Sequence, residues 1–303
     1  MEREDYLWLV GLAAIWGGSF YFIKIALHDI PPIALVFGRC LSAAVALAVY
    51  LALRRIPLSE VLSVWRAGLV IGVLNAALPY TLIATAEQYV DSSLAGILNA
   101  TAPLWTALLA PLFADADRLG RRQAVGLALG FAGTVILARP SGSLLNSSFL
   151  GSMAVVAATL AYAVATHYAH RHFRHVAPAV PAFLQCAWAA VLLLPLVVFV
   201  HPTHMPSVSA IAATVWLGVG ATGLAMVISF RLVKRVGASR TIVVTYLIPP
   251  LALAWGVVLL RERPSVMVLL ALVLILGGVA FITRSGRSAS PARSAESPVA
   301  EVA

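Results

Sequence analysis

Charged residues are scarce in this 303-residue chain: Asp, Glu, Lys and Arg make up 11% of it, whereas hydrophobic residues make up 61%. A typical soluble domain carries about 25% charged residues. With less than half of that share, the chain has too little polar surface to cover a globule in water. A soluble enzyme, a disordered chain and a collagen-like fibre are therefore excluded, and an integral membrane protein is predicted.

Cysteine is also scarce, because only Cys40 and Cys186 are present and both lie inside apolar runs. They do not indicate a disulfide framework. No G-x-x-x-x-G-K-[ST] loop occurs, so ATP-driven pumping is not indicated. The histidine clusters have no Cys or carboxylate beside them, and we therefore expect neither a metal site nor a cofactor.

Long apolar runs dominate what remains. Ten runs of about 20 residues predict ten transmembrane helices, at 6–26, 33–53, 65–86, 93–113, 121–138, 149–171, 179–200, 208–231, 239–260 and 265–284. The first run is predicted to be a permanent span, because residues 1–5 lack the basic region of a cleaved signal peptide. Residues 285–303, rich in Ser, Ala, Pro and Arg, are predicted to form a disordered cytoplasmic tail. The fold class is therefore an all-α membrane protein.

Basic residues predict the orientation of these spans. If the N-terminus is cytoplasmic, 16 of the 21 Lys and Arg residues lie on the inner side and 4 on the outer side, while Arg39 lies within the second span. Both termini are thus predicted to be cytoplasmic, in a multi-pass protein of the cell (inner) membrane. The basic inner loops are expected to contact anionic lipids on the cytoplasmic face of the bilayer. Such thinly spread charge does not indicate a nucleic-acid partner.

The chain contains an internal repeat. Shifting the sequence by 146 residues places Phe37 on Phe183 and Pro103 on Pro249. We therefore expect two five-helix repeats, at 1–140 and 147–284. Because five is odd, the second repeat enters the membrane from the opposite side, which is the architecture of many secondary transporters.

Three short motifs resemble those of the EamA-domain carriers, a family in the drug/metabolite transporter superfamily. They are Ile15-Trp16-Gly17-Gly18-Ser19-Phe20 with Lys24, Phe37-Gly38-Arg39, and Leu247-Ile248-Pro249-Pro250 followed by Arg261-Glu262-Arg263. The resemblance covers about residues 6–284. The first half departs from the pattern, because Ala116, flanked by Asp115 and Asp117, stands 13 residues after its proline where the second half has Glu262.

The resemblance implies ten spans, of which spans 1, 3, 4, 6, 8 and 9 surround a central cavity. It also implies the transport of small metabolites, often amino acids and their relatives, and it says little about which metabolite is carried.

Prolines near the middle of three spans mark the candidate binding site. A proline within a helix leaves the carbonyl four residues earlier without its donor, and in lipid such a carbonyl is tolerated mainly where it lines a cavity. Each freed carbonyl belongs to a polar residue: Pro79 frees Asn75, Pro103 frees Asn99, Pro249 frees Thr245 and Pro250 frees Tyr246. The alternative is a kinked helix without a ligand, which is our interpretation of Pro195, since it frees the apolar Val191.

Aromatic residues within the spans could supply the apolar walls of such a site. Trp16 and Tyr162 are equivalent under the repeat, and Tyr80, Trp105 and Tyr246 also lie well inside spans. Packing between helices is the alternative for each of them. The predicted substrate-binding set is Trp16, Asn75, Pro79, Tyr80, Asn99, Pro103, Trp105, Tyr162, Thr245, Tyr246 and Pro249.

Ionisable groups within the spans are few, and charge there is functional by default. Lys24, Arg39 and Glu87 lie in the outer parts of their spans, where they could bind a substrate carboxylate, pair with one another or reach the interface. His167 is the one near-neutral titratable group inside a span. Because no carboxylate lies at mid-depth, we expect facilitated diffusion or a weak pH dependence through His167.

Taken together, the residues predict a secondary transporter that moves small polar metabolites by alternating access. Amino acids or related compounds are the expected substrates and export is the favoured direction. A scaffold or receptor subunit without transport, and a membrane-embedded enzyme, are the alternatives; we see no catalytic constellation and predict that the chain is not an enzyme. The partners are a small-molecule substrate and the bilayer, and the sequence leaves open whether the protein forms a homodimer.

Overall fold

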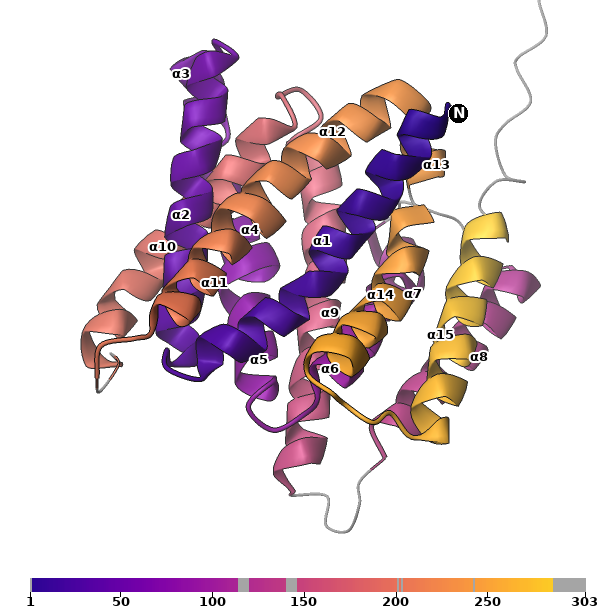
Figure 1. Ribbon diagram of the computed structural model, residues 1–303. Helices are drawn as coiled ribbons and strands as arrows, with labels where there is room; N and C mark the ends of the chain where they lie inside the picture. The colour runs from indigo at the N-terminus through magenta and orange to yellow at the C-terminus, as the bar shows by residue number, and fades with distance from the viewer. Residues whose placement is uncertain are drawn as a thin grey trace, which may run out of the picture.

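The computed structural model describes residues 2–113, 120–139, 146–200, 202, 204–241 and 243–285. Within these ranges all regular elements are helices (Figure 1). The first half contains α1 (Arg3–Leu27), α2 (Pro32–Leu53), α3 (Leu58–Ser63), α4 (Trp65–Gly72), η1 (Val73–Ala77), α5 (Leu78–Ala86), α6 (Ser92–Asn99), α7 (Ala102–Leu109), η2 (Ala110–Phe113) and α8 (Arg121–Leu137). The second half contains α9 (Ser147–His172), α10 (Ala179–Phe199), α11 (Val208–Gly218), η3 (Val219–Leu224), α12 (Ala225–Val236), α13 (Ala238–Thr241), α14 (Val243–Leu259) and α15 (Val266–Ser285).

Eight helical stretches of the described chain are long and apolar enough to cross a membrane, and α14 is a shorter apolar helix. The prediction of an all-α, multi-pass membrane protein is therefore confirmed. The number of ten spans, the inverted repeats and the side on which the termini lie stay predictions. The predicted tail, from residue 286 on, and the acidic pair Asp115 and Asp117 lie outside the described residues.

Helix boundaries follow local chemistry. Asn146 accepts a hydrogen bond from the Phe149 amide at 2.8 Å and so caps the start of α9, and Ser207 caps α11 in the same way. α12 ends at Gly237, whose φ of +85° lies in the left-handed region that only glycine adopts readily. These residues define where α9 and α11 begin and where α12 ends.

Two spans contain a π-helix at equivalent positions. η1 lies directly before Pro79, and η3 begins 146 residues after η1, which is the shift that aligns the two halves of the sequence. Proline accounts for η1, since its ring and missing N–H disturb the preceding turn. η3 contains no proline and directly follows Gly218. A Cβ at position 218 would collide with Ser42 Oγ and the Arg39 carbonyl. Glycine at this position therefore allows α11 to approach α2 closely.

The other two predicted breaks differ from each other. The span around Pro103 is interrupted, because α6 ends at Asn99 and α7 begins at Ala102. α14, by contrast, runs without interruption through Pro249 and Pro250. A proline in a helix therefore predicts a missing hydrogen bond more reliably than it predicts a visible break.

The helices form one bundle in which α8 and α15 lie side by side at one edge, and α2 and α10 pack together on the other side (Figure 1). The start of α1 and the end of α15 lie at the same end of the bundle, which we call the terminal end (Figure 1). We call the opposite end, where α1 is followed by α2, the far end.

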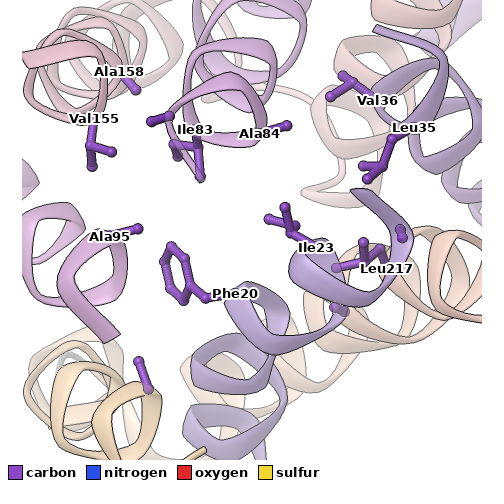
Figure 2. Packing of buried hydrophobic residues seen from close by; sticks show 14 of the residues in the cluster. Phe20, Ile23, Leu35, Val36, Ile83, Ala84, Ala95, Val155, Ala158 and Leu217 are labelled. Carbon is purple, nitrogen blue, oxygen red and sulfur yellow. The ribbon is translucent and has the colours of Figure 1, made fainter. Parts of the chain in front are cut away.

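The main hydrophobic core lies in the half of the bundle toward the far end. Figure 2 shows Phe20 and Ile23 of α1 facing Ile83 of α5, with Ala95 of α6 and Val155 of α9 beside them. All five side chains are buried. This layer packs α1, α5, α6 and α9 against one another.

Candidate functional site

A central cavity of about 410 Å³ lies between the spans of both halves. Residues from α1, α2, η1, α5, α9, η3, α12, α14 and the α6–α7 region line it. They are Trp16, Ser19, Phe20, Ile23, Arg39, Asn75, Tyr80, Ile83, Asn99, Ala102, Tyr162, Thr166, Ala221, Thr222, Met226, Thr245 and Ile248.

The structure brings six of the predicted binding residues together in this cavity: Trp16, Asn75, Tyr80, Asn99, Tyr162 and Thr245. The remaining five of the predicted set do not line it. Pro79 and Pro249 are buried within their helices, and Pro103 lines an adjoining cavity. Trp105 packs against Phe131 of α8, with ring centroids 4.7 Å apart.

Tyr246 lies away from the cavity as well. Its hydroxyl donates to the Val279 carbonyl at 3.1 Å and contacts Thr283, both on α15. Tyr246 and Trp105 thus connect neighbouring helices to the α8–α15 pair. This is the packing alternative that the sequence could not separate from a binding role, because residues on opposite faces of a helix are only one or two positions apart.

The aromatic walls of the cavity are held by specific contacts. The Trp16 indole Nε1 donates to the Ala221 carbonyl at 3.1 Å, inside η3. A π-helix exposes carbonyls that an α-helix would use, and this one is taken by an indole N–H. Tyr80 and Tyr162 meet edge to face, with ring centroids 6.5 Å apart.

Polar groups are spaced between these walls. Asn75 donates through Nδ2 to Gln185 Oε1 of α10 at 2.5 Å. Asn99 points a buried Oδ1 that has no hydrogen-bond partner in the described part of the chain. Thr222 donates to the Leu217 carbonyl at 2.9 Å.

Arg39, which was predicted as a charged candidate, also lines the central cavity, with its guanidinium carbon 3.9 Å from the centre of the Tyr80 ring. Its Nε donates to Thr222 Oγ1 at 3.2 Å. A buried cation therefore stands among the aromatic and amide groups.

A wider space, which we call the vestibule, joins the central cavity toward the terminal end. Its volume is about 600 Å³, and it shares Asn99, Tyr162 and Thr245 with the cavity. Its wall extends to His170 near the end of α9. Thr166, which lines both spaces, is exposed, so the central cavity is reached from the terminal end.

His167 also lines the vestibule. Its imidazole is buried, its Nε2 lies 2.9 Å from the Thr106 carbonyl, and its ring stacks on Phe113 at 4.7 Å. These contacts tie α9 to α7 and η2 and account for the residue structurally. Among the residues that the structure describes, no cluster of three His, Cys, Asp or Glu side chains could hold a metal ion.

Lys24 and Glu87 belong to the closure of the far end rather than to the cavity. The Lys24 ammonium donates to the Glu87 carbonyl and, at 2.8 Å, to the Val90 carbonyl, and so binds α1 to the loop between α5 and α6. The Glu87 carboxyl group is fully buried, and neither of its oxygens has a hydrogen-bond partner among the described residues.

Glu262 provides a second contact at the far end. Its Oε1 accepts hydrogen bonds from the Ser92 amide and hydroxyl, each at 2.8 Å, and its Oε2 accepts one from the Ser93 amide at 3.0 Å. The carboxylate thus satisfies the N-terminus of α6, where the helix dipole favours negative charge. Gly256 leaves room for it, because a Cβ there would collide with Oε2.

The contact between Glu262 and the two serines could not be predicted from the sequence. Glu262 stands in a family motif, whereas Ser92 and Ser93 stand at the start of an apolar run. Serines at a helix start and a carboxylate elsewhere do not reveal their partnership, because 169 residues separate Ser93 from Glu262.

Asp29 makes the third contact at the far end. It accepts hydrogen bonds from the Ser207 hydroxyl and, at 2.9 Å, from the Ser207 amide, which ties the α1–α2 loop to the start of α11. The Ser207 hydroxyl and the neighbouring His28 hold the pKa of Asp29 well below its ordinary value. A separate pocket of about 720 Å³ at this end is lined by Lys24, Asp29, Asp91 and Glu262 and shares no residue with the central cavity.

Comparison with known proteins gives matches along the whole chain. The model of the EamA-like transporter family matches residues 5–139 and again residues 149–284. The inner membrane transporter YedA of Escherichia coli K12 is 28% identical over 293 residues, which cover 96% of this chain and 94% of YedA.

Two further relatives have names that state a substrate. A probable terminal-alkyne amino-acid exporter of Streptantibioticus cattleyicolor is 28% identical, over 98% of this chain and 99% of the relative. A probable amino-acid metabolite efflux pump of Escherichia coli K12 is 26% identical, over 92% of this chain and 94% of the relative. One solved crystal structure superposes with a TM-score of 0.67 at 22% identity, covering 95% of this chain and 100% of that chain, and so shares the fold.

Proposed function

The chain belongs to the EamA-like transporter family, and we propose that it is a secondary transporter that exports amino acids or related small polar metabolites by alternating access. It is a multi-pass inner membrane protein, and YedA is named as an inner membrane transporter too. The exporters and efflux pumps among those relatives support the direction and the substrate class. An enzyme finds no support in these names.

The central cavity is the observation on which the proposal depends. It combines rigid aromatic walls with a few polar groups, which is how small-molecule sites are generally built. Three of its polar groups come from places where spans are interrupted or distorted: Asn75 lies in η1, Asn99 ends α6 and Thr222 lies in η3. Irregular backbone at membrane depth is tolerated where it lines such a cavity.

Two inverted five-helix repeats, 1–140 and 147–284, are part of the proposal, and the helix contacts support them. α1 packs against α14, α11 and α12, while its counterpart α9 packs against α7, α4 and α5. α2 packs against its own counterpart α10, and α8 packs against its counterpart α15. A contact pattern that maps onto itself when the halves are exchanged is expected of two repeats related by a pseudo-two-fold axis.

The proposed binding residues are Trp16, Asn75, Tyr80, Asn99, Tyr162 and Thr245, which the cavity brings together. The aromatic groups bind the apolar part of a metabolite, and the amide and hydroxyl groups bind its polar part. The terminal end is proposed to be cytoplasmic, which would make the vestibule the entry route for export. Reporter fusions at residue 290 test this orientation, and an external reporter there would contradict it.

The experiment that tests the function is flux of amino acids in proteoliposomes. Asn99→Leu removes the unpartnered acceptor, and a lost hydrogen bond typically costs on the order of 1 kcal/mol, or more where a buried group is left unpaired. We expect transport to fall several-fold while membrane insertion is intact, because leucine is cheaper in lipid than asparagine.

The matched control is Val191→Leu. Val191 is exposed on α10, four residues before Pro195, and we expect this substitution to leave transport nearly unchanged. Equal transport by both variants at equal expression would contradict the proposed site. Absence of flux by the wild-type protein would favour a scaffold or receptor subunit instead.

A further inference from the structure

We propose that Arg39 is the carboxylate anchor of the central cavity, so that the substrates are compounds with a free carboxylate, such as amino acids, rather than their amides, esters or amines. This inference rests on the proposed transport function and names the substrate class of the same site. It depends on the burial, the partners and the surroundings of a single guanidinium group.

Arg39 is a buried cation that has no counter-ion among the residues described by the structure. It is 8% exposed. In the described part of the chain no carboxylate lies within ion-pair distance of it, although ion pairs occur elsewhere, as between Arg235 and Asp5. A buried charge without a partner is unfavourable, and an anionic ligand group would relieve this cost.

The hydrogen bonds of Arg39 leave its two terminal nitrogens available. Nε is committed to Thr222 Oγ1, and the Tyr80 ring covers one face of the guanidinium. Neither Nη atom has a hydrogen-bond partner among the described residues. Two parallel N–H groups in a fixed plane match the two oxygens of a carboxylate, and arginine is the side chain best suited to this bidentate contact.

The orientation of the guanidinium is determined by backbone geometry. Thr222 accepts from Arg39 and is itself bonded to the Leu217 carbonyl across five residues, a spacing that exists because η3 is a π-helix. Gly218, at the start of that turn, contacts the backbone of Arg39 directly. Thr222 is therefore a positioning residue for Arg39, since it directs the guanidinium plane without needing to contact the ligand.

The same cavity also offers a group for an ammonium. Asn99 Oδ1 is a buried acceptor without a partner among the described residues, and Asn99 lines the cavity together with Arg39. One cation and one unpartnered acceptor between aromatic walls form a site for a zwitterion with an apolar side chain. No Asp or Glu is among the described residues that line the cavity, so none of them competes for the guanidinium.

The test is counterflow of a radiolabelled mixture of the twenty common L-amino acids into proteoliposomes that hold the wild-type protein. Unlabelled amino acids are added as competitors, and their carboxamides are added in parallel at the same concentrations. We expect the amides to compete at least about tenfold more weakly, because they cannot form the charged bidentate contact. This comparison uses only wild-type protein and is independent of the folding of any variant.

Three variants examine the residue itself. Arg39→Gln should lower counterflow about tenfold or more, and Arg39→Lys should recover part of it, because lysine keeps the charge and loses the planar fork. Thr222→Val should raise KM more than it lowers the maximal rate, since it disorders the guanidinium and leaves its charge in place. Size-exclusion profiles monitor folding throughout.

The outcomes separate this inference from the proposed function. Amides that compete as well as amino acids, or an Arg39→Gln protein that transports like the wild type, would overturn the inference and leave transport standing. No counterflow above that of empty liposomes would overturn the proposed function, and the inference with it. Loss in Arg39→Gln together with weak competition by amides supports both.

Discussion

The far end of the bundle is closed by several independent contacts, whereas at the terminal end the same helices leave a polar vestibule. Lys24, Glu262 and Asp29 each bind backbone groups of another segment at the far end, above a layer that includes Phe20 and Ile23. At the terminal end Arg235 pairs with acidic residues at the start of α1 and does not cross the vestibule. The central cavity therefore communicates with one side only.

The chemistry of these closing contacts indicates how they could open. Each joins a charged side chain to backbone amides or carbonyls of another segment, and Asp29 lies in addition beside the exposed His28 and His204. When such a contact opens, water can replace the backbone partner, so the net cost per bond is modest. The proposed alternating access requires the far end to open in the other state, and contacts of this kind allow it without separating buried ion pairs.

The largest effect that we expect is a difference in thiol labelling between the two ends. In a background with Cys40→Ala and Cys186→Ala, Thr166→Cys in the vestibule should react with a charged thiol reagent on the order of tenfold faster than Ala95→Cys in the apolar layer, because the reaction needs an accessible thiolate. Thr166 is exposed and Ala95 is fully buried. Detergent-solubilised protein gives the reagent access to both ends, and similar rates would mean that the far end is not closed.

Glu262→Gln should weaken the closure. The amide keeps the size of the side chain and loses the charge that three donors of Ser92 and Ser93 share. Hydrogen bonds to charged groups contribute about 1.5–3 kcal/mol, so labelling of Ala95→Cys should rise several-fold.

The control for that variant makes the same change at the terminal end. Glu60 accepts a hydrogen bond from the Ala177 amide, and Glu60→Gln should leave Ala95→Cys labelling unchanged. If both variants raised the labelling equally, the closure would depend on overall stability and not on the contact with α6.

Acidification should not open the far end. The Ser207 hydroxyl is the main reason why the pKa of Asp29 is lower in the folded protein than its ordinary value of 3.8. The contribution of Asp29 to stability is therefore complete above pH 3.8. It is lost only when the pH falls further, through the lower pKa of the folded state. Burial raises the pKa of Asp91, so protonation of that group would favour the closed fold. When the pH is lowered from 7 to 5, the labelling rate of Ala95→Cys relative to that of Thr166→Cys should therefore not rise. A rise would mean that another titrating group controls the closure.

The smallest effect is expected for Tyr246→Phe. The lost hydroxyl binds α15 and not the cavity, so thermal stability should fall by about 1 kcal/mol while the amino-acid flux and the labelling ratio stay the same. A fall in flux that exceeds the fall in folded protein would place Tyr246 in the transport path.

The fold was largely predictable because membrane helices are specified by local composition. Runs of apolar residues, bounded by prolines and caps, predicted the helices closely; the run 33–53 corresponds to α2 at Pro32–Leu53. The interruptions were harder, because their causes differ. Pro79 and Pro103 indicated two of them, whereas η3 arises from the close approach at Gly218, which depends on α2 and could not be inferred from the span alone.

The candidate site was predictable in part for a similar reason. Trp16, Asn99 and Tyr162 were identified by polar or aromatic character within spans, and the cavity contains them. Arg39 was identified as a charged candidate, whereas its place in the cavity beside Thr222 depends on how α2 packs against η3. Thr222 was missed, since a threonine within an apolar span is common, and its importance follows only from the guanidinium that it contacts.

The two π-helices have a consequence for changes in chain length. A π-helix holds an extra residue in its turn, so deleting one residue within Val73–Ala77 should restore a continuous α-helix and leave the following segment facing the same way. Tyr80 would then still face the cavity. The matching deletion within Val219–Leu224 should likewise leave Met226 in place in the other half. The same deletion within a regular helix such as α2 would rotate every later residue of that helix by about 100°. Single-codon deletions should therefore be tolerated at these two places better than within the regular helices.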